Sequence, residues 1–62
     1  MQKQYRTSRE VRARYGDASE MSLWRWLRDP KLDFPKPLII QRRRFWTDEQ
    51  LDEFDARQRE VA

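Results

Sequence analysis

The chain of 62 residues has no cysteine, no histidine and a single glycine, and its longest apolar run is Leu38-Ile39-Ile40. Without cysteine and histidine, a zinc finger, a disulfide framework and catalysis by a thiol or an imidazole are excluded. The apolar run is far shorter than the roughly 20 residues of a transmembrane helix, and Met1-Gln2-Lys3-Gln4 is not followed by the apolar segment of a signal peptide. We therefore expect a cytoplasmic protein that binds neither a metal nor a membrane.

Aromatic and charged side chains are well represented. The chain contains three Trp, three Phe and two Tyr, and 40% of its residues are charged. The core of so small a domain contributes only about 3 to 5 kcal/mol, so the aromatic side chains are needed to fill it. A buried substrate cavity then has no room, and the carboxylates that could do acid-base work cluster in one solvent-facing segment. We expect no enzyme activity, no cofactor and no small-molecule substrate.

The charges are distributed unevenly along the chain. Residues 1–46 carry 12 Lys and Arg against 5 Asp and Glu, whereas residues 47–62 carry 2 against 6. A basic segment of this kind is typical of nucleic-acid binding, although it also fits a merely solvated surface. Eleven of the 14 cations are arginine, whose planar guanidinium suits bidentate contacts to phosphate and guanine. The composition therefore favours a nucleic-acid partner.

The first half of the chain predicts two helices joined by a tight turn. Thr7 and Glu10 have the spacing of a capping box, and the helix that they begin runs to about Tyr15, where Gly16 ends it. Val11 and Tyr15 are its buried side chains. Ser19 is a good N-cap for a second helix, which must end before Pro30. The spacing is that of a helix-turn-helix.

The second predicted helix has two distinct faces. Leu23, Trp26 and Leu27 recur at the spacing of a core-facing stripe, while Met21, Arg25 and Arg28 fall on the opposite side, with Ser22 and Trp24 at its edges. Such an exposed face suits the major groove, where arginine binds guanine edges or phosphates and methionine contacts a thymine methyl group. The alternative is that both arginines are only solvated and that Trp24 is part of the core.

A stiff connector and a hairpin are predicted next. Pro35 and Pro37 exclude a helix, and Leu38–Ile40 and Arg44–Trp46 are short β-rich runs separated by Gln41-Arg42-Arg43. Burial of Leu38, Ile40 and Phe45 would stabilise this hairpin. Consecutive arginines at its tip can follow a phosphate backbone or enter a narrow minor groove, so we interpret the hairpin as a wing.

A third helix closes the chain. Thr47 to Gln50 form a second capping box. The side chains that follow at helical spacing are Leu51, Phe54, Gln58 and Val61. Five acidic residues on this helix would repel phosphate: Asp48, Glu49, Asp52, Glu53 and Asp55. We expect the helix to pack behind the hairpin with its acidic face either solvated or in contact with a basic partner.

The ordered combination of these motifs resembles the AlpA-like and excisionase group of small MerR-like winged-helix DNA-binding proteins. The resemblance covers about residues 5–56, which we expect to be the ordered core of one domain spanning residues 1–62. The segments that carry it are Tyr5 to Val11, Gly16, Ser19 to Leu27 with Trp24-Arg25-Trp26-Leu27, Phe34-Pro35-Lys36-Pro37, Arg42 to Trp46 and Asp48 to Phe54. The implied fold class is α+β, a small winged helix-turn-helix composed of helix, turn, helix, two-stranded wing and C-terminal helix.

The resemblance, together with the exposed positions above, gives a set of candidate DNA contacts. In the recognition helix these are Ser19, Glu20, Met21, Ser22, Trp24, Arg25 and Arg28. In the wing they are Gln41, Arg42, Arg43 and Arg44, and at the start of the first helix they are Thr7, Ser8 and Arg9. The family's members act either as recombination directionality factors, which bend DNA beside an attachment site of a phage or mobile element, or as regulators of prophage genes.

The expected partners follow from the small size of the domain. Single DNA-binding modules bury only about 600 to 1,000 Å², so we expect cooperative binding of neighbouring copies to repeated sites on double-stranded DNA, with an integrase as a further partner. We favour the excisionase role over the regulator role. A protein-interaction module that acts through the acidic helix is the alternative of another class, and an RNA reader that stacks bases on Trp24 and Trp46 is a third.

Overall fold

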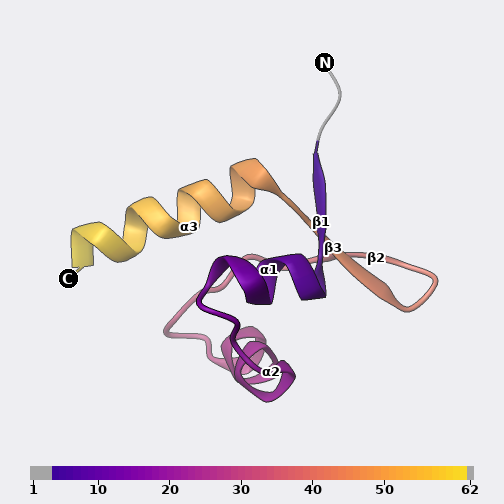
Figure 1. Cartoon of the computed structure of the whole chain (residues 1–62). Helices are drawn as coiled ribbons and strands as arrows, with labels where there is room; N and C mark the ends of the chain where they lie inside the picture. Colours follow the sequence, from indigo (N-terminus) through magenta and orange to yellow (C-terminus); the bar gives the residue numbers. More distant parts are fainter. Residues whose placement is uncertain (1–3, 62) are drawn as a thin grey trace.

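The computed structural model describes residues 4–61, with the side chain of Val61 left out. The elements follow one another as β1 (Tyr5–Thr7), α1 (Ser8–Arg14), α2 (Glu20–Arg28), β2 (Leu38–Ile40), β3 (Arg43–Thr47) and α3 (Asp48–Val61). In Figure 1, α1 and α2 lie on one side of the sheet, the β2–β3 hairpin projects away from the helices, and α3 extends in the opposite direction. The α+β class is confirmed, and the arrangement is compatible with a small winged-helix-like fold.

All three helices begin at the predicted caps. The Thr7 hydroxyl accepts from the Glu10 amide while the Glu10 carboxylate accepts from the Thr7 amide. Thr47 and Gln50 repeat this arrangement at the start of α3. Ser19 caps α2, since its hydroxyl accepts from the Ser22 amide at 3.1 Å. The boundaries were predictable because each cap depends on residues at most three positions apart.

The turn between α1 and α2 is made by residues in the left-handed region. Gly16 has a φ of 73° and Asp17 a φ of 57°, and the Ala18 amide donates to the Arg12 carbonyl at 3.0 Å. Glycine adopts this conformation without steric cost, and aspartate tolerates it better than most residues. The prediction that Gly16 ends the first helix is confirmed.

The sheet has a third strand that the sequence did not predict. Its order is β1-β3-β2 and both pairings are antiparallel, with Arg6 opposite Trp46 and Ile39 opposite Arg44. In the family resemblance the residues of β1 belong to the segment that begins the first helix. The run Tyr5–Thr7 is also too short to predict a strand by its own sequence pattern. Only pairing with β3, about forty residues later in the chain, makes it a strand.

The core contains buried side chains from α1, α2, β3 and α3, and one from the connector between α2 and β2. Its members are Val11, Leu23, Phe34, Trp46, Leu51 and Phe54, and Tyr15, Trp26, Leu27 and Leu32 pack against them. Phe34 is central, because its ring lies edge-on to Phe54 at 4.8 Å between centroids and also contacts Trp46. The Trp46 indole is fully buried and its Nε1 donates to the Pro35 carbonyl at 2.8 Å. Trp46 is therefore a core residue, a point that the sequence left open.

The expected burial of the hairpin is wrong for two of its residues. Leu38 and Ile40 remain 48% and 52% exposed, whereas Phe45 is partly buried. Cross-strand partners share one face of a sheet, so Tyr5, Leu38, Ile40 and Phe45 lie opposite the face of Trp46. We call these four side chains the open sheet face. Gln58 is also exposed, because the part of α3 that contacts the core ends near Phe54.

Candidate nucleic-acid interface

Helix α2 presents the two faces that its sequence predicts. Leu23 is 2% exposed and packs in the core, and Trp26 and Leu27 pack beside it. On the other side Met21 is 58% and Trp24 47% exposed, and Arg25 and Arg28 are exposed as well. Trp24 is therefore not a core residue. The Arg28 guanidinium lies 4.6 Å from the centre of the Trp24 ring, a cation-π contact that holds both side chains on the exposed face.

The wing is a two-residue hairpin rather than the three-residue connection that the sequence predicted. Gln41 and Arg42 form its turn with φ values of 47° and 69°, and Arg43 is already the first residue of β3. Positive φ at both central positions is the signature of a type I′ turn, which usually takes Asn-Gly. The turn thus holds two non-glycine residues in a costly conformation, with all three arginines exposed.

The start of α1 and the wing form an arginine-lined groove. An open hollow of about 360 Å³ lies between them, lined by Thr7, Ser8, Arg9, Arg12, Arg42, Arg43 and Arg44. The Thr7 hydroxyl is committed to the helix cap, so Arg9 and the wing arginines supply the free donors. The structure brings together two candidate sets that are more than thirty residues apart in the chain.

Arg12 belongs to this groove and was missing from the sequence-based set. Its Nε atom is buried and has no hydrogen-bond partner among the described residues, and its ion pair with Glu20 is long, at 3.8 Å. A buried guanidinium donor without a partner is costly unless a further acceptor reaches it. The three-residue spacing from Arg9, which places the two on one helix face, is the signal that could have found it.

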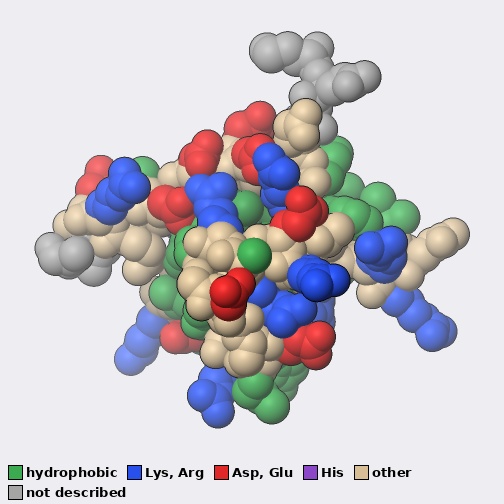
Figure 2. All heavy atoms as spheres, viewed as in Figure 1, with side chains coloured by type: hydrophobic (Ala, Val, Ile, Leu, Met, Phe, Trp, Pro, Cys, Tyr) green, Lys and Arg blue, Asp and Glu red, His purple; other side chains and the backbone are tan. Residues whose placement is uncertain are grey.

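A second hollow connects the wing to α2. It measures about 450 Å³ and is lined by Glu20, Met21, Trp24 and Arg44. Arg44 lines both hollows, so the helix start, the wing and α2 present one continuous surface, which we call the basic face. It comprises the residues of the two hollows together with the exposed Arg25 and Arg28. Figure 2 shows Lys and Arg side chains spread from the helices toward the projecting wing.

Some of the predicted contact residues lie outside the two hollows. Gln41 is exposed in the wing turn, and Arg25 and Arg28 are exposed on α2. Ser19 is occupied as the N-cap, and its hydroxyl also donates to the Ser22 hydroxyl at 3.1 Å. Both serine side chains are therefore engaged at the start of α2, which they stabilise.

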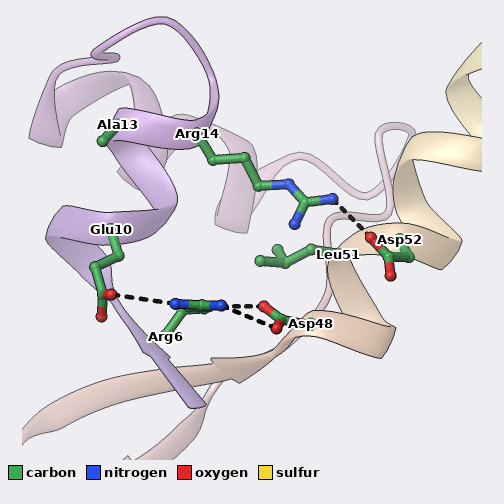
Figure 3. A pocket seen from close by; sticks show the side chains of 7 residues that line it. All are labelled: Arg6, Glu10, Ala13, Arg14, Asp48, Leu51 and Asp52. Atoms are coloured by element: carbon green, nitrogen blue, oxygen red, sulfur yellow. Dashed lines mark hydrogen bonds and ion pairs between the residues drawn. The ribbon is translucent and has the colours of Figure 1, made fainter. Parts of the chain in front are cut away.

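Arg6 and Arg14, which lie away from the basic face, are paired with acidic residues of α3. Arg6 donates to Asp48 from Nε at 2.8 Å, and Arg14 donates to Asp52 at 2.9 Å (Figure 3). Arg14 also donates to Asp55. The hydrogen bonds from Arg6 hold the pKa of Asp48 below its ordinary value. The acidic face of α3 is thus not simply solvated, because three of its carboxylates hold it to β1 and α1.

The arginines without an ion pair lie mostly on the basic face. Among residues 4–61 these are Arg9, Arg25, Arg28, Arg42, Arg43, Arg44 and Arg59. Only Arg59, on α3, lies elsewhere. Within residues 4–61 the fold therefore pairs most arginines away from the basic face with its own carboxylates and leaves most arginines of the basic face without an ion pair.

Two other kinds of site find no support in the described residues. No three acidic side chains in that part of the chain are grouped to hold a metal ion. None of the helices within residues 4–61 has the length and apolar character to cross a membrane. The basic face is the strongest candidate for a functional surface.

No protein-family model, curated protein or solved structure matches this chain. The assignment to the AlpA-like and excisionase group consequently remains a prediction from the sequence motifs. The function proposed below therefore rests mainly on the geometry and charge of the basic face.

Proposed function

We propose that this chain binds double-stranded DNA through the basic face. The observation that carries the proposal is the segregation of charge: six of the seven arginines without an ion pair among residues 4–61 lie on this one surface, next to exposed Met21 and Trp24. Phosphate neutralisation by arginine supplies most of the affinity in such complexes. An exposed methionine and tryptophan beside arginines supply contacts to base edges.

The two halves of the basic face have different tasks in this proposal. Helix α2 enters the major groove, where Met21, Trp24 and Arg25 read base edges. The wing arginines and Arg9 hold the phosphate backbone on either side. About five phosphate contacts would make the logarithm of the affinity fall with the logarithm of the salt concentration at a slope near −4 to −5.

The biological role proposed is that of an architectural factor in recombination. This role is supported by the motif resemblance and by size, since one module of 62 residues buries too little surface to be highly specific alone. Several copies bound at adjacent sites would bend DNA so that an integrase excises an element. Regulation of transcription from a promoter is the second candidate role, and it uses the same surface.

Gel-shift titration of labelled duplexes tests the binding, and circular permutation of the site within the duplex tests bending. The duplexes are DNA that flanks the gene, DNA from any nearby attachment site and a random sequence, each at two salt concentrations. We expect a ladder of complexes and bending on one segment: the attachment site for an excision factor, a promoter for a regulator. Affinity for every segment equal to that for the random duplex would overturn sequence-specific binding.

Matched arginine variants separate the tasks. Arg43→Ala should weaken binding to all duplexes similarly and reduce the salt slope by about 1, whereas Arg25→Ala should weaken only the preferred segment. Arg59→Ala removes an equally unpaired cation from α3 and should change neither. If Arg59→Ala weakens binding as much as Arg43→Ala, the effect is one of net charge and the basic face is not the interface. Biological activity that survives loss of the wing arginines would indicate the protein-interaction alternative.

A further inference from the structure

Strand β2 is an uncovered apolar edge of the sheet. It is the last strand in the order β1-β3-β2, and its residues Leu38, Ile39 and Ile40 are 48%, 56% and 52% exposed. Proteins usually shield such an edge with charge, a bulge or a covering segment. Hydrophobic side chains are uncovered toward the wing in Figure 2 as well. Three consecutive exposed aliphatic residues on an edge indicate an association surface.

At this edge, only one residue of β2 has a backbone N–H and C=O that are not used in pairing with β3. Ile40 and Arg43 flank the two-residue turn, so they form the hydrogen-bonded pair that closes the hairpin. Hydrogen-bonded and non-bonded pairs alternate along an antiparallel ladder, so Ile39 opposite Arg44 is a non-bonded pair. The N–H and C=O of Ile39 therefore point away from β3, toward the open side.

We propose that two copies of this chain associate by pairing their β2 strands antiparallel about a two-fold axis at Ile39. The two Ile39 residues then exchange both backbone hydrogen bonds. Leu38 lies opposite the partner's Ile40 and Ile40 opposite the partner's Leu38, so the apolar side chains of the two open sheet faces become continuous. The register is self-complementary, which is what an isologous interface requires.

The charges at the two ends of β2 fit the same arrangement. A groove of about 490 Å³ at the start of β2 is lined by Tyr5, Lys36, Pro37, Leu38, Thr47, Glu49, Gln50 and Glu53. Neither Glu49 nor Glu53 is in an ion pair within residues 4–61, and they outnumber the single lysine. Antiparallel pairing brings the partner's Gln41 and the partner's Arg42 toward this acidic groove. Opposite charges at both ends favour a second copy over an unrelated apolar peptide.

The length of the strand limits the affinity. Pro37 has no N–H to donate and the turn begins at Gln41, so only three residues of each copy can pair. Interfaces at the small end of the size range are weak, and we expect a dissociation constant on the order of 100 µM. Adjacent binding sites on DNA would raise the local concentration and favour the pair.

Sedimentation equilibrium without DNA tests the pairing, because the backbone N–H of Ile39 can be removed without breaking a hydrogen bond between β2 and β3. Ile39→Pro removes only the outward N–H, and proline is tolerated on an edge strand in that orientation. The wild-type mass should rise from 7.8 kDa toward twice that value with increasing concentration, and Ile39→Val should behave alike. Ile39→Pro should stay monomeric with an unchanged circular dichroism spectrum. A wild-type chain that stays monomeric up to about 1 mM, or a proline variant that dimerises like the wild type, overturns the proposal.

Disulfide trapping provides a second test, since the natural chain has no cysteine. Directly opposed, hydrogen-bonded residues have Cα atoms about 5.5 Å apart, within the range that a disulfide spans. Under mild oxidation Ile39→Cys should form covalent dimers at least about tenfold faster than Gln58→Cys, which places a thiol on an exposed position of α3. Equal rates would contradict the β2 register. Both tests run without DNA, so their outcome is independent of the proposed DNA binding.

Discussion

The Tyr15 hydroxyl donates a 2.7 Å hydrogen bond to the Asp55 carboxylate and so joins the end of α1 to α3. Arg14 donates to the same carboxylate from the neighbouring position. Burial alone would raise the pKa of Asp55, but the hydrogen bonds from Arg14 and Tyr15 outweigh it and lower that pKa. α3 is thus fixed to α1 by a charged network in addition to the apolar contacts of Leu51 and Phe54.

Tyr15→Phe should destabilise the fold without changing DNA affinity. The variant keeps the edge-on ring contacts to Trp26, Phe34 and Phe54 but loses the hydroxyl donor. Hydrogen bonds to charged groups contribute about 1.5 to 3 kcal/mol, and partial exposure reduces this to about 1 to 2 kcal/mol. Urea denaturation measures the loss. Tyr5→Phe is the control, and equal unfolding midpoints for the two variants would show that the Tyr15 hydroxyl contributes nothing.

Stability should fall in acid. The pKa values of Asp48, Asp55 and Glu10 are lowered from ordinary values of 3.8, 3.8 and 4.5. The unfolded chain therefore binds protons at a higher pH than the folded one, and stability is lost as the pH drops through this range and below it. The melting temperature should be steady above about pH 5.5 and decrease below about pH 4.5. Asp48→Asn should flatten the acid limb, and a parallel limb in that variant would refute the role of Asp48.

The two residues of the wing turn should lower the stability of the fold while increasing its affinity for DNA. Gln41 and Arg42 both have positive φ, at a cost of about 1 kcal/mol or more each. The double change Gln41→Asn and Arg42→Gly supplies the residues that this turn prefers and should stabilise the protein by about 1 to 2 kcal/mol. Thermal denaturation and DNA titration, run together, should show a higher melting temperature with weaker binding. A lower melting temperature would mean that the turn is not strained.

The exposed and the buried tryptophan should respond oppositely to substitution. Trp24→Ala should leave the unfolding midpoint nearly unchanged, because the side chain is 47% exposed, but should reduce preference for a specific duplex. Trp46→Ala should cost about 3 to 5 kcal/mol, enough to unfold a domain of this size. Circular dichroism and fluorescence quenching by DNA check this pair. Quenching that persists in Trp24→Ala would place the contact at another tryptophan.

Local features of the fold could be predicted because they depend on residues close in sequence. The caps at Thr7, Ser19 and Thr47, the break at Gly16 and the two faces of α2 need only spacing and side-chain chemistry. The exposed face of α2 and the arginine-bearing wing were predictable for the same reason. The exposure of Trp24 was not, because position 24 lies on the flank between the core-facing and exposed sides of the helix.

Other features depend on contacts between distant segments, which spacing along the chain does not encode. Pairing with β3 turned Tyr5–Thr7 into a strand, and the absence of a covering helix among the described residues left Leu38 and Ile40 exposed. Arg6 and Arg14 contact α3 from 42 and 38 positions away. The sequence alone determined the helices, their caps and the supply of arginines. Only the tertiary structure decided which arginines are neutralised by carboxylates and which remain without an ion pair on the basic face, because ion pairing requires proximity in space.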